Sequence, residues 1–186
     1  MRSRVFLSIL SVLALVCAAA GAQAHHDMAK MTDEQIVASA MKAAPAAIGK
    51  DATVIDVGAD GAIRTVRKGT NNFTCMADSP GTPGPDPMCG DSNAMEWVDA
   101  WIHHTAPAAG KVGFMYMLEG GTDASNTDPY ATAPSASNHW IQTGPHVMVV
   151  GGGAMAGYPR TADPDTAKPY VMWADTPYEH LMLPVK

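Results

Sequence analysis

The chain has 186 residues, 47% of them apolar, and its 12 basic and 18 acidic side chains give a formal net charge of −6. A single domain of this length can bury an adequate core. The acidic balance argues against nucleic acid, itself a polyanion, as a partner.

Residues 1–24 have the three parts of a secretory signal peptide. Arg2 and Arg4 form the basic segment, residues 5–20 form the apolar segment, and Ala-Gln-Ala at 22–24 forms the cleavage site. Removal of these 24 of the 186 residues would leave a mature chain of 162. The pattern predicts export to the periplasm or out of the cell.

The mature chain, residues 25–186, is expected to be one domain. Loss of two arginines lowers the basic count from 12 to 10 against 18 acidic residues, so its formal net charge becomes −8. No later segment is apolar for long enough to span a membrane. Cys17 raises the alternative of a lipoprotein, but Val16 stands where lipoproteins have a small residue. The oligomeric state is left open by the sequence.

The mature N-terminus would read His25-His26. A free N-terminal His can chelate copper through its amine and its ring nitrogen together, which is the first half of the histidine brace of copper monooxygenases. No other motif of those enzymes follows. The alternative is a frayed terminus with incidental histidines and adventitious metal binding.

The first half of the mature chain predicts a helix followed by a hairpin. Thr32 and Gln35 form a capping box ahead of an amphipathic helix that ends near Pro45. Residues 53–57 and 62–68 are predicted strands, and Asp60-Gly61 between them favours a type I′ turn.

Residues 73–104 form the stretch around which the domain is expected to pack. The strand-like segment 73–76 leads into a loop with four prolines that ends at Cys89. Cys75 and Cys89 suit a disulfide in an exported chain, and the alternative of a metal site lacks a matching set of His and Cys. In the chain-entropy model such a loop closure stabilises by about 3 kcal/mol.

An amphipathic helix is predicted directly after this loop, over residues 93–104. Asn93 is the expected N-cap with Glu96 completing a capping box, and Asp91 and Ser92 are alternative caps. The apolar positions follow helical spacing and should face the core. They are Ala94, Trp97, Val98, Trp101 and Ile102.

The second half predicts strands separated by one long loop. Residues 112–118 are apolar on both faces and should lie centrally in the sheet. The loop 120–138 is polar, and loops longer than about 15 residues often carry function. Residues 146–150, 170–174 and 180–185 are three more strands. These elements predict one α+β domain, a mainly antiparallel sheet of about five to seven strands on one or two amphipathic helices.

One pattern that suits metal binding occurs twice, each time within a predicted strand. His146 and Met148 form one His-x-Met pair, and His180 and Met182 form the other. Residues two apart in a strand share a face, so the four side chains would converge if the strands were neighbours. Imidazole with thioether is a soft ligand set that suits copper. The alternative is that the methionines only fill the core.

Three segments carry a family resemblance. FTCMADSPGTPGPDPMC, GFMYMLEGGTDASNTDPYATAP and WADTPYEHLMLPV resemble a group of bacterial signal-peptide-bearing proteins that has no assigned activity. The resemblance extends over about residues 44–185. It implies bacterial export and a single domain, and it transfers no site residue.

We therefore expect a non-catalytic exported binding protein for copper, another soft metal or a small ligand. The alternatives are a small secreted enzyme with its site under the loop 120–138, and an envelope interaction protein with an exposed apolar patch. The chain has neither a G-x-S-x-G nor an H-E-x-x-H motif, and no catalytic residue is singled out.

Overall fold

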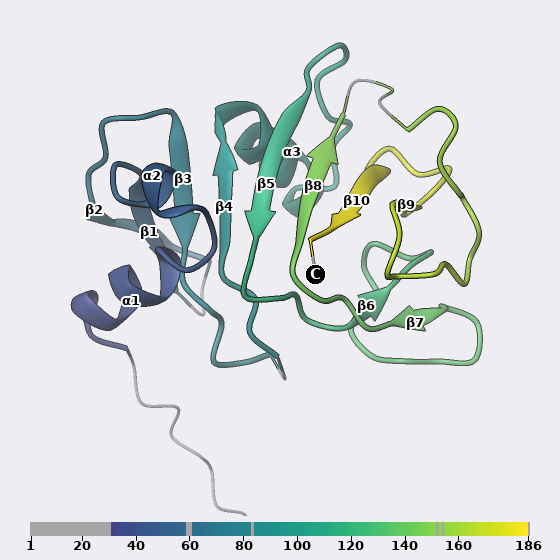
Figure 1. Ribbon diagram of the computed structural model, residues 1–186, viewed down its shortest axis with the longest axis horizontal. Helices are drawn as coiled ribbons and strands as arrows, with labels where there is room; N and C mark the ends of the chain where they lie inside the picture. The colour runs from purple at the N-terminus through teal and green to yellow at the C-terminus, as the bar shows by residue number, and fades with distance from the viewer. Residues whose placement is uncertain (1–30, 59–60, 83, 152, 154, 186) are drawn as a thin grey trace, which may run out of the picture.

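The computed structural model describes residues 31–58, 61–82, 84–151, 153 and 155–185. The predicted signal peptide, His25, His26 and Asp60 lie outside these residues. The described chain forms the α+β domain expected from the sequence, with a mainly antiparallel sheet and three short helices (Figure 1). No helix in the described part is long and apolar enough to cross a bilayer.

The main sheet has eight strands in the order β2-β1-β3-β4-β5-β8-β10-β9, and β6 and β7 pair separately. Among the strand pairs of the described residues, only β1–β3 is parallel. The helices are α1 (Asp33–Ala40), α2 (Ala46–Gly49) and α3 (Ser92–Ile102). The strands are β1 (Thr53–Val57), β2 (Ile63–Arg67), β3 (Phe73–Met76), β4 (Met88–Asp91), β5 (Gly113–Met117), β6 (Ala124–Ser125), β7 (Trp140–Ile141), β8 (His146–Val150), β9 (Tyr170–Met172) and β10 (His180–Pro184).

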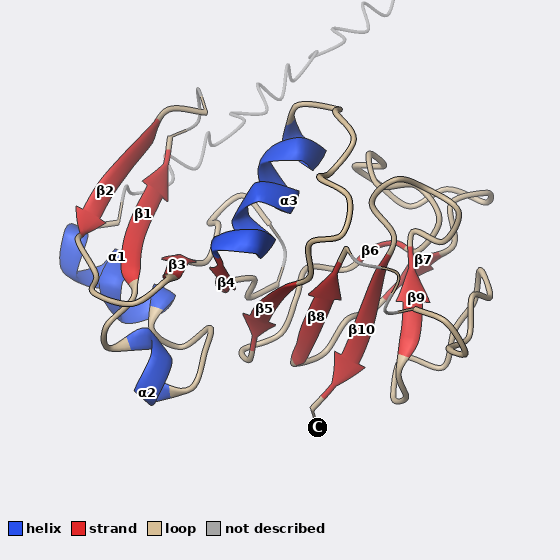
Figure 2. Cartoon of the chain, turned by 90° about the horizontal axis from the view of Figure 1, so that it is seen from above, coloured by secondary structure: helices blue, strands red, loops and turns tan. Residues whose placement is uncertain are grey.

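The helices lie on opposite faces of the sheet. α1 and α2 cover one face at the β1–β3 end, and α3 covers the other face near β4 and β5 (Figure 2). The side chains of β5, β8, β9 and β10 that lie on the α3 side form one core cluster with Trp97 and Val98 of that helix. This half of the sheet contains the candidate site.

The first helix begins as its sequence predicts. The hydroxyl of Thr32 accepts a hydrogen bond from Gln35 N, and Gln35 Oε1 accepts one from Thr32 N. The helix buries Ile36 and Ala40 beside the disulfide in a second core cluster. It ends earlier than expected, because residues 41–44 form turns rather than a continued helix.

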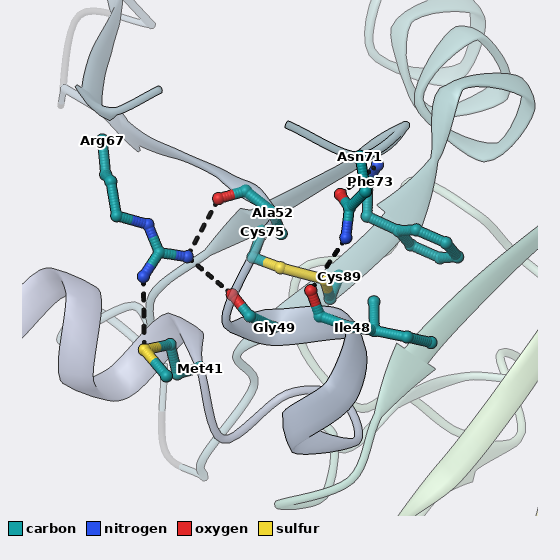
Figure 3. The surroundings of a disulfide bond; sticks show 9 residues. All are labelled: Met41, Ile48, Gly49, Ala52, Arg67, Asn71, Phe73, Cys75 and Cys89. Carbon is teal, nitrogen blue, oxygen red and sulfur yellow. Dashed lines mark hydrogen bonds between the residues drawn. A yellow bond between two sulfur atoms is a disulfide. The ribbon is translucent and has the colours of Figure 1, made fainter. Parts of the chain in front are cut away.

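Cys75 and Cys89 form the expected disulfide. They lie directly opposite each other on the antiparallel strands β3 and β4, and both are fully buried. Arg67 supports the same region, because its guanidinium donates to the carbonyls of Gly49 at 2.6 Å and Ala52 at 2.9 Å (Figure 3). This end of the sheet is held by covalent and backbone-directed bonds.

The helix α3 starts one residue before the predicted range 93–104, and its N-cap lies two residues before the expected Asn93. Its N-cap is Asp91, whose carboxylate accepts a hydrogen bond of 2.8 Å from Ala94 N. Asn93, the expected cap, instead donates its side-chain amide to Val112 O at 2.8 Å. That bond draws the start of α3 onto β5, where a Cβ at Gly113 would lie 2.3 Å from Ala94 N.

Three strands were not expected. β4 occupies the end of the proline-rich segment and runs directly into α3. β6 lies inside the loop 120–138 and pairs with β7, which lies just beyond that loop. Each has two to four residues, which is too short for a clear alternation of apolar and polar side chains. The loop 120–138 is therefore partly ordered by pairing.

Candidate functional site

A cavity of about 170 Å³ lies between α3 and the β5-β8-β10 part of the sheet. Its walls are mostly thioether and aromatic side chains, with two buried histidines among them. The residues of β6 and the segments on either side of the β6–β7 hairpin close it on another side. The lining residues that matter for its chemistry are Asp86, Met88, Trp97, Met115, Met117, Gly121, Thr122, Thr143, His146, Met148, Met172, Trp173, His180 and Met182.

The two His-x-Met pairs lie on neighbouring strands and line this one cavity. β8 and β10 are antiparallel neighbours, with Met148 directly opposite Met182. His146 is opposite Pro184, and His180 is opposite Val150. The histidines therefore lie at opposite ends of the pairing, with the thioethers between them.

Three further methionines lie beside these residues on the strands that flank them. Met117 of β5 is directly opposite His146, and Met172 of β9 is directly opposite His180. Met115 of β5 is opposite Met148. Directly paired residues in an antiparallel sheet have Cβ atoms about 5 Å apart on the same face, so each imidazole has a thioether neighbour across the sheet.

Both histidines are held in one tautomer by backbone carbonyls. His146 Nδ1 lies 2.7 Å from Gly144 O, and His180 Nδ1 lies 3.0 Å from Tyr178 O. A carbonyl only accepts, so each Nδ1 carries the proton and each Nε2 presents a lone pair. His180 Nε2 is buried and has no hydrogen-bond partner within the described chain. Such backbone support of Nδ1 is typical of histidines that bind a metal through Nε2.

Burial keeps both rings neutral at pH 7. Desolvation lowers the pKa of His146, against the opposing effect of its hydrogen bond to Gly144 O. Desolvation also lowers the pKa of His180, to about 4, and a positive charge on His146 would lower it slightly further. Neutral imidazole is the form that binds metal ions, so no proton has to be displaced from Nε2.

Two tryptophans enclose the His180 end. The rings of Trp97 and Trp173 meet the His180 ring edge to face, with centroids 5.3 and 4.9 Å away. Trp173 has a φ of 54°, an uncommon conformation for a bulky residue. It is held there by hydrogen bonds from its backbone N to Asn126 O and from its Nε1 to Ser125 O, both 2.9 Å. Backbone strain of this kind often accompanies functional sites.

The His146 end lies against half-buried residues at the rim. A Cβ at Gly121 would lie 2.6 Å from Thr143 Oγ1 and 2.9 Å from His146 Cε1, so only glycine leaves room there. Thr143 donates to Thr122 O at 3.1 Å, and Thr122 donates to Asp86 Oδ2 at 2.9 Å. Neither hydroxyl bonds to a histidine.

In the described part of the chain, no three His, Cys, Asp or Glu side chains come together as a metal site. Polar side chains of the loop 120–138 accept hydrogen bonds from the backbone of the same loop. Ser125 Oγ accepts from Thr127 N and Asp128 N, and Asp128 Oδ1 accepts from Tyr130 N. Asp99 of α3 and His103, the C-cap of that helix, form an exposed pair in which Asp99 Oδ1 lies 3.2 Å from His103 Nδ1.

The sequence did not single out Trp97, Trp173, Gly121 or Thr143 as site residues. Trp97 has the helical spacing of an ordinary core residue, and the other three lie in segments whose path depends on tertiary packing. The histidines were the one usable signal, because a His two residues from a Met occurs in two strand-like segments.

Comparison of the chain with protein-family models, with curated proteins and with solved structures finds no match in any of the three. The case for a function therefore depends on the chemistry of the cavity.

Proposed function

We propose that the protein is an exported, non-catalytic binding protein for a soft metal ion, copper(I). The observation that carries the proposal is the composition of the cavity. Two imidazoles with Nε2 lone pairs and six thioethers line a volume of about 170 Å³, and both imidazoles are neutral at pH 7.

The ligand types favour a soft ion over a hard one. Thioether sulfur and imidazole nitrogen suit copper(I), whereas magnesium and calcium require several oxygen ligands. The carboxylate at the rim, Asp86, is already engaged, because it accepts hydrogen bonds from Ser79 N and from Thr122 Oγ1. An ion in the cavity would therefore meet mainly uncharged donors, which is a further reason to favour a monovalent ion.

Export is part of the proposal, and two features support it. Residues 1–24 have the composition of a signal peptide, and a buried disulfide is typical of oxidising compartments. Thioethers are useful there as copper ligands, because free thiols oxidise outside the cytoplasm.

The test is a titration of the chain that starts at His25 with Cu(I), against a competing Cu(I) chelator under anaerobic conditions. Binding tighter than micromolar, lost in the His146→Ala/His180→Ala variant, is the expected result. Binding that survives in this variant and disappears when the N-terminal amine is blocked would place the site at His25 and His26. Absence of binding beyond micromolar would overturn the copper proposal.

The matched control is Met155→Leu. Met155 is 3% exposed but packs with Val149, Val171 and Leu181 in the core cluster on the other face of the sheet. This variant should bind Cu(I) like the parent, so any loss in the cavity variants reflects the donor atoms rather than the loss of a buried methionine.

A second candidate is a small apolar ligand with one polar group. The aromatic and thioether walls suit it, and two buried atoms, Trp97 Nε1 and His180 Nε2, lack partners within the described chain. Replacement of Met148 and Met182 by Leu separates the two candidates. Leucine keeps the apolar volume and removes the sulfur, so an apolar ligand such as phenol would still raise the melting temperature while Cu(I) binding would be lost.

The alternative of a secreted enzyme has weaker support. The cavity does lie partly under the start of the loop 120–138, through Gly121, Thr122 and Ala124. A nucleophile activated by an imidazole would need a hydroxyl bonded to it. The hydroxyls of Thr122 and Thr143 donate elsewhere, so the arrangement favours binding.

A further inference from the structure

We propose that the cavity holds two copper(I) ions, one at each histidine, and that ions pass from an outer station at His146 to an inner station at His180. The inference rests on the proposed function and adds its stoichiometry and its direction. The outer station is His146 with Met117 and Met148. The inner station is His180 with Met172 and Met182.

The two stations have the same donor set in the same arrangement. In each, one methionine lies directly across the sheet from the histidine, Met117 for His146 and Met172 for His180. The other lies two residues along the same strand and on the same face, Met148 for His146 and Met182 for His180. Each station thus offers one imidazole nitrogen and two thioether sulfurs, enough for the low coordination number of copper(I).

The register argues against a single ion shared by both histidines. His180 is opposite Val150, four residues from His146 on the neighbouring strand. Four residues of a strand span about 13 Å. Two ligands of one ion lie within about 4 Å of each other, since metal–nitrogen bonds are near 2 Å. Strand side chains project mainly away from the sheet, so their lean along the strand would have to supply about 9 Å before the two rings could share one ion.

The surroundings of the two stations differ, and this gives the direction. The ring of His146 lies beside the half-buried rim residues Gly121 and Thr143. The ring of His180 lies between Trp97 and Trp173, both of them buried, and its Nε2 is fully enclosed. An ion from solvent therefore meets His146 first.

A row of thioethers joins the stations. Met115, Met148 and Met182 are directly paired across β5, β8 and β10, between the levels of the two histidines. An ion can move along this row by exchanging one sulfur for the next, without becoming free in the apolar cavity. Two ions about 10 Å apart repel each other, so the second should bind roughly tenfold more weakly at an effective dielectric constant near 20.

The test is the Cu(I) stoichiometry of the parent and of the two single variants, His146→Ala and His180→Ala. We expect two equivalents for the parent and one for each variant. One equivalent for the parent, lost completely in either variant, would mean one shared ion and would overturn this inference while leaving the proposed function intact. No Cu(I) binding by the parent would overturn both.

X-ray absorption at the copper edge gives a second readout that does not depend on stoichiometry. The inference expects one nitrogen and two sulfurs per copper in the parent and in each single variant. Two nitrogens per copper would indicate a shared ion and would overturn it. Met155→Leu serves again as the control that removes a sulfur outside the cavity.

The direction of transfer is tested by tryptophan fluorescence, because the rings of Trp97 and Trp173 lie against His180 of the inner station. Stopped-flow mixing of the parent with Cu(I) should change this fluorescence, and in His146→Ala the same change should be several-fold slower. A change as fast as in the parent would overturn the direction. His180→Ala should bind its one ion with little change in fluorescence.

Discussion

Met148 and Met182 are directly opposite each other on the antiparallel strands β8 and β10. Both are buried in the cavity under α3, and each is preceded on its own strand by a histidine two residues away. Because the strands are antiparallel, the two histidines lie on opposite sides of this methionine pair. The pairing of the strands therefore places two thioethers between two imidazoles.

Replacing the two central methionines should separate metal binding from stability. Exchanges between Met and Leu in a core usually cost less than about 1.5 kcal/mol, because volume and apolar character are kept. The variant Met148→Leu/Met182→Leu should therefore remain folded while its Cu(I) affinity falls at least tenfold. Urea denaturation and the chelator competition measure the two effects. An unchanged affinity would show that these sulfurs are not ligands.

Acidification should destabilise the fold through the buried histidines. The pKa of His180 is about 4 in the folded chain against 6.5 for an ordinary histidine, so the unfolded chain binds the extra proton first as the pH falls. The stability is fully present above pH 6.5 and is lost between pH 6.5 and 4, by up to about 3 kcal/mol. The lowered pKa of His146 acts in the same direction.

Urea denaturation of the metal-free protein at pH 7 and pH 4.5 measures this loss. The His180→Gln variant cannot take up the proton, so its stability should change less over the same interval. An equal change in the parent and the variant would assign the pH dependence to other groups.

The sequence predicted the two histidine strands, and the structure supplied their relation. Strand-like segments with His-x-Met spacing put each pair on one face. β8 and β10 are neighbours in the sheet, although β9 lies between them in the sequence. β9 pairs with the other edge of β10. One sequence without an alignment carries no information about long-range pairing of this kind.

The aromatic side of the cavity could not be predicted for a different reason. Trp173 reaches it through a positive φ, which is held by hydrogen bonds to Ser125 and Asn126, almost fifty residues earlier. Local propensity disfavours that conformation for tryptophan. The start of α3 shows the same effect on a smaller scale, because the bond from Asn93 to Val112 O leaves the capping role to Asp91.

A methyl group at Gly121 should disturb the His146 end of the cavity. A Cβ there would lie 2.6 Å from Thr143 Oγ1 and 2.9 Å from His146 Cε1, so one of these side chains has to move. We expect Gly121→Ala to lose about 1 to 3 kcal/mol of stability through this overpacking, and to weaken Cu(I) binding. The control is Gly144→Ala, because nothing lies within 4 Å of a Cβ at that position. Equal behaviour of the two variants would show that His146 tolerates displacement.

The disulfide should stabilise the fold without taking part in binding. Cys75 and Cys89 are fully buried and belong to the core cluster with α1, whereas the cavity belongs to the cluster under α3. Removing the cross-link in Cys75→Ala/Cys89→Ala should cost about 3 kcal/mol, the entropy of closing a loop of about 15 residues, measured by urea denaturation. The folded variant should still bind Cu(I) with an affinity within a few-fold of the parent. A complete loss of binding in a folded variant would show that the two halves of the sheet depend on each other, and that the cavity needs the cross-linked strands to keep its shape.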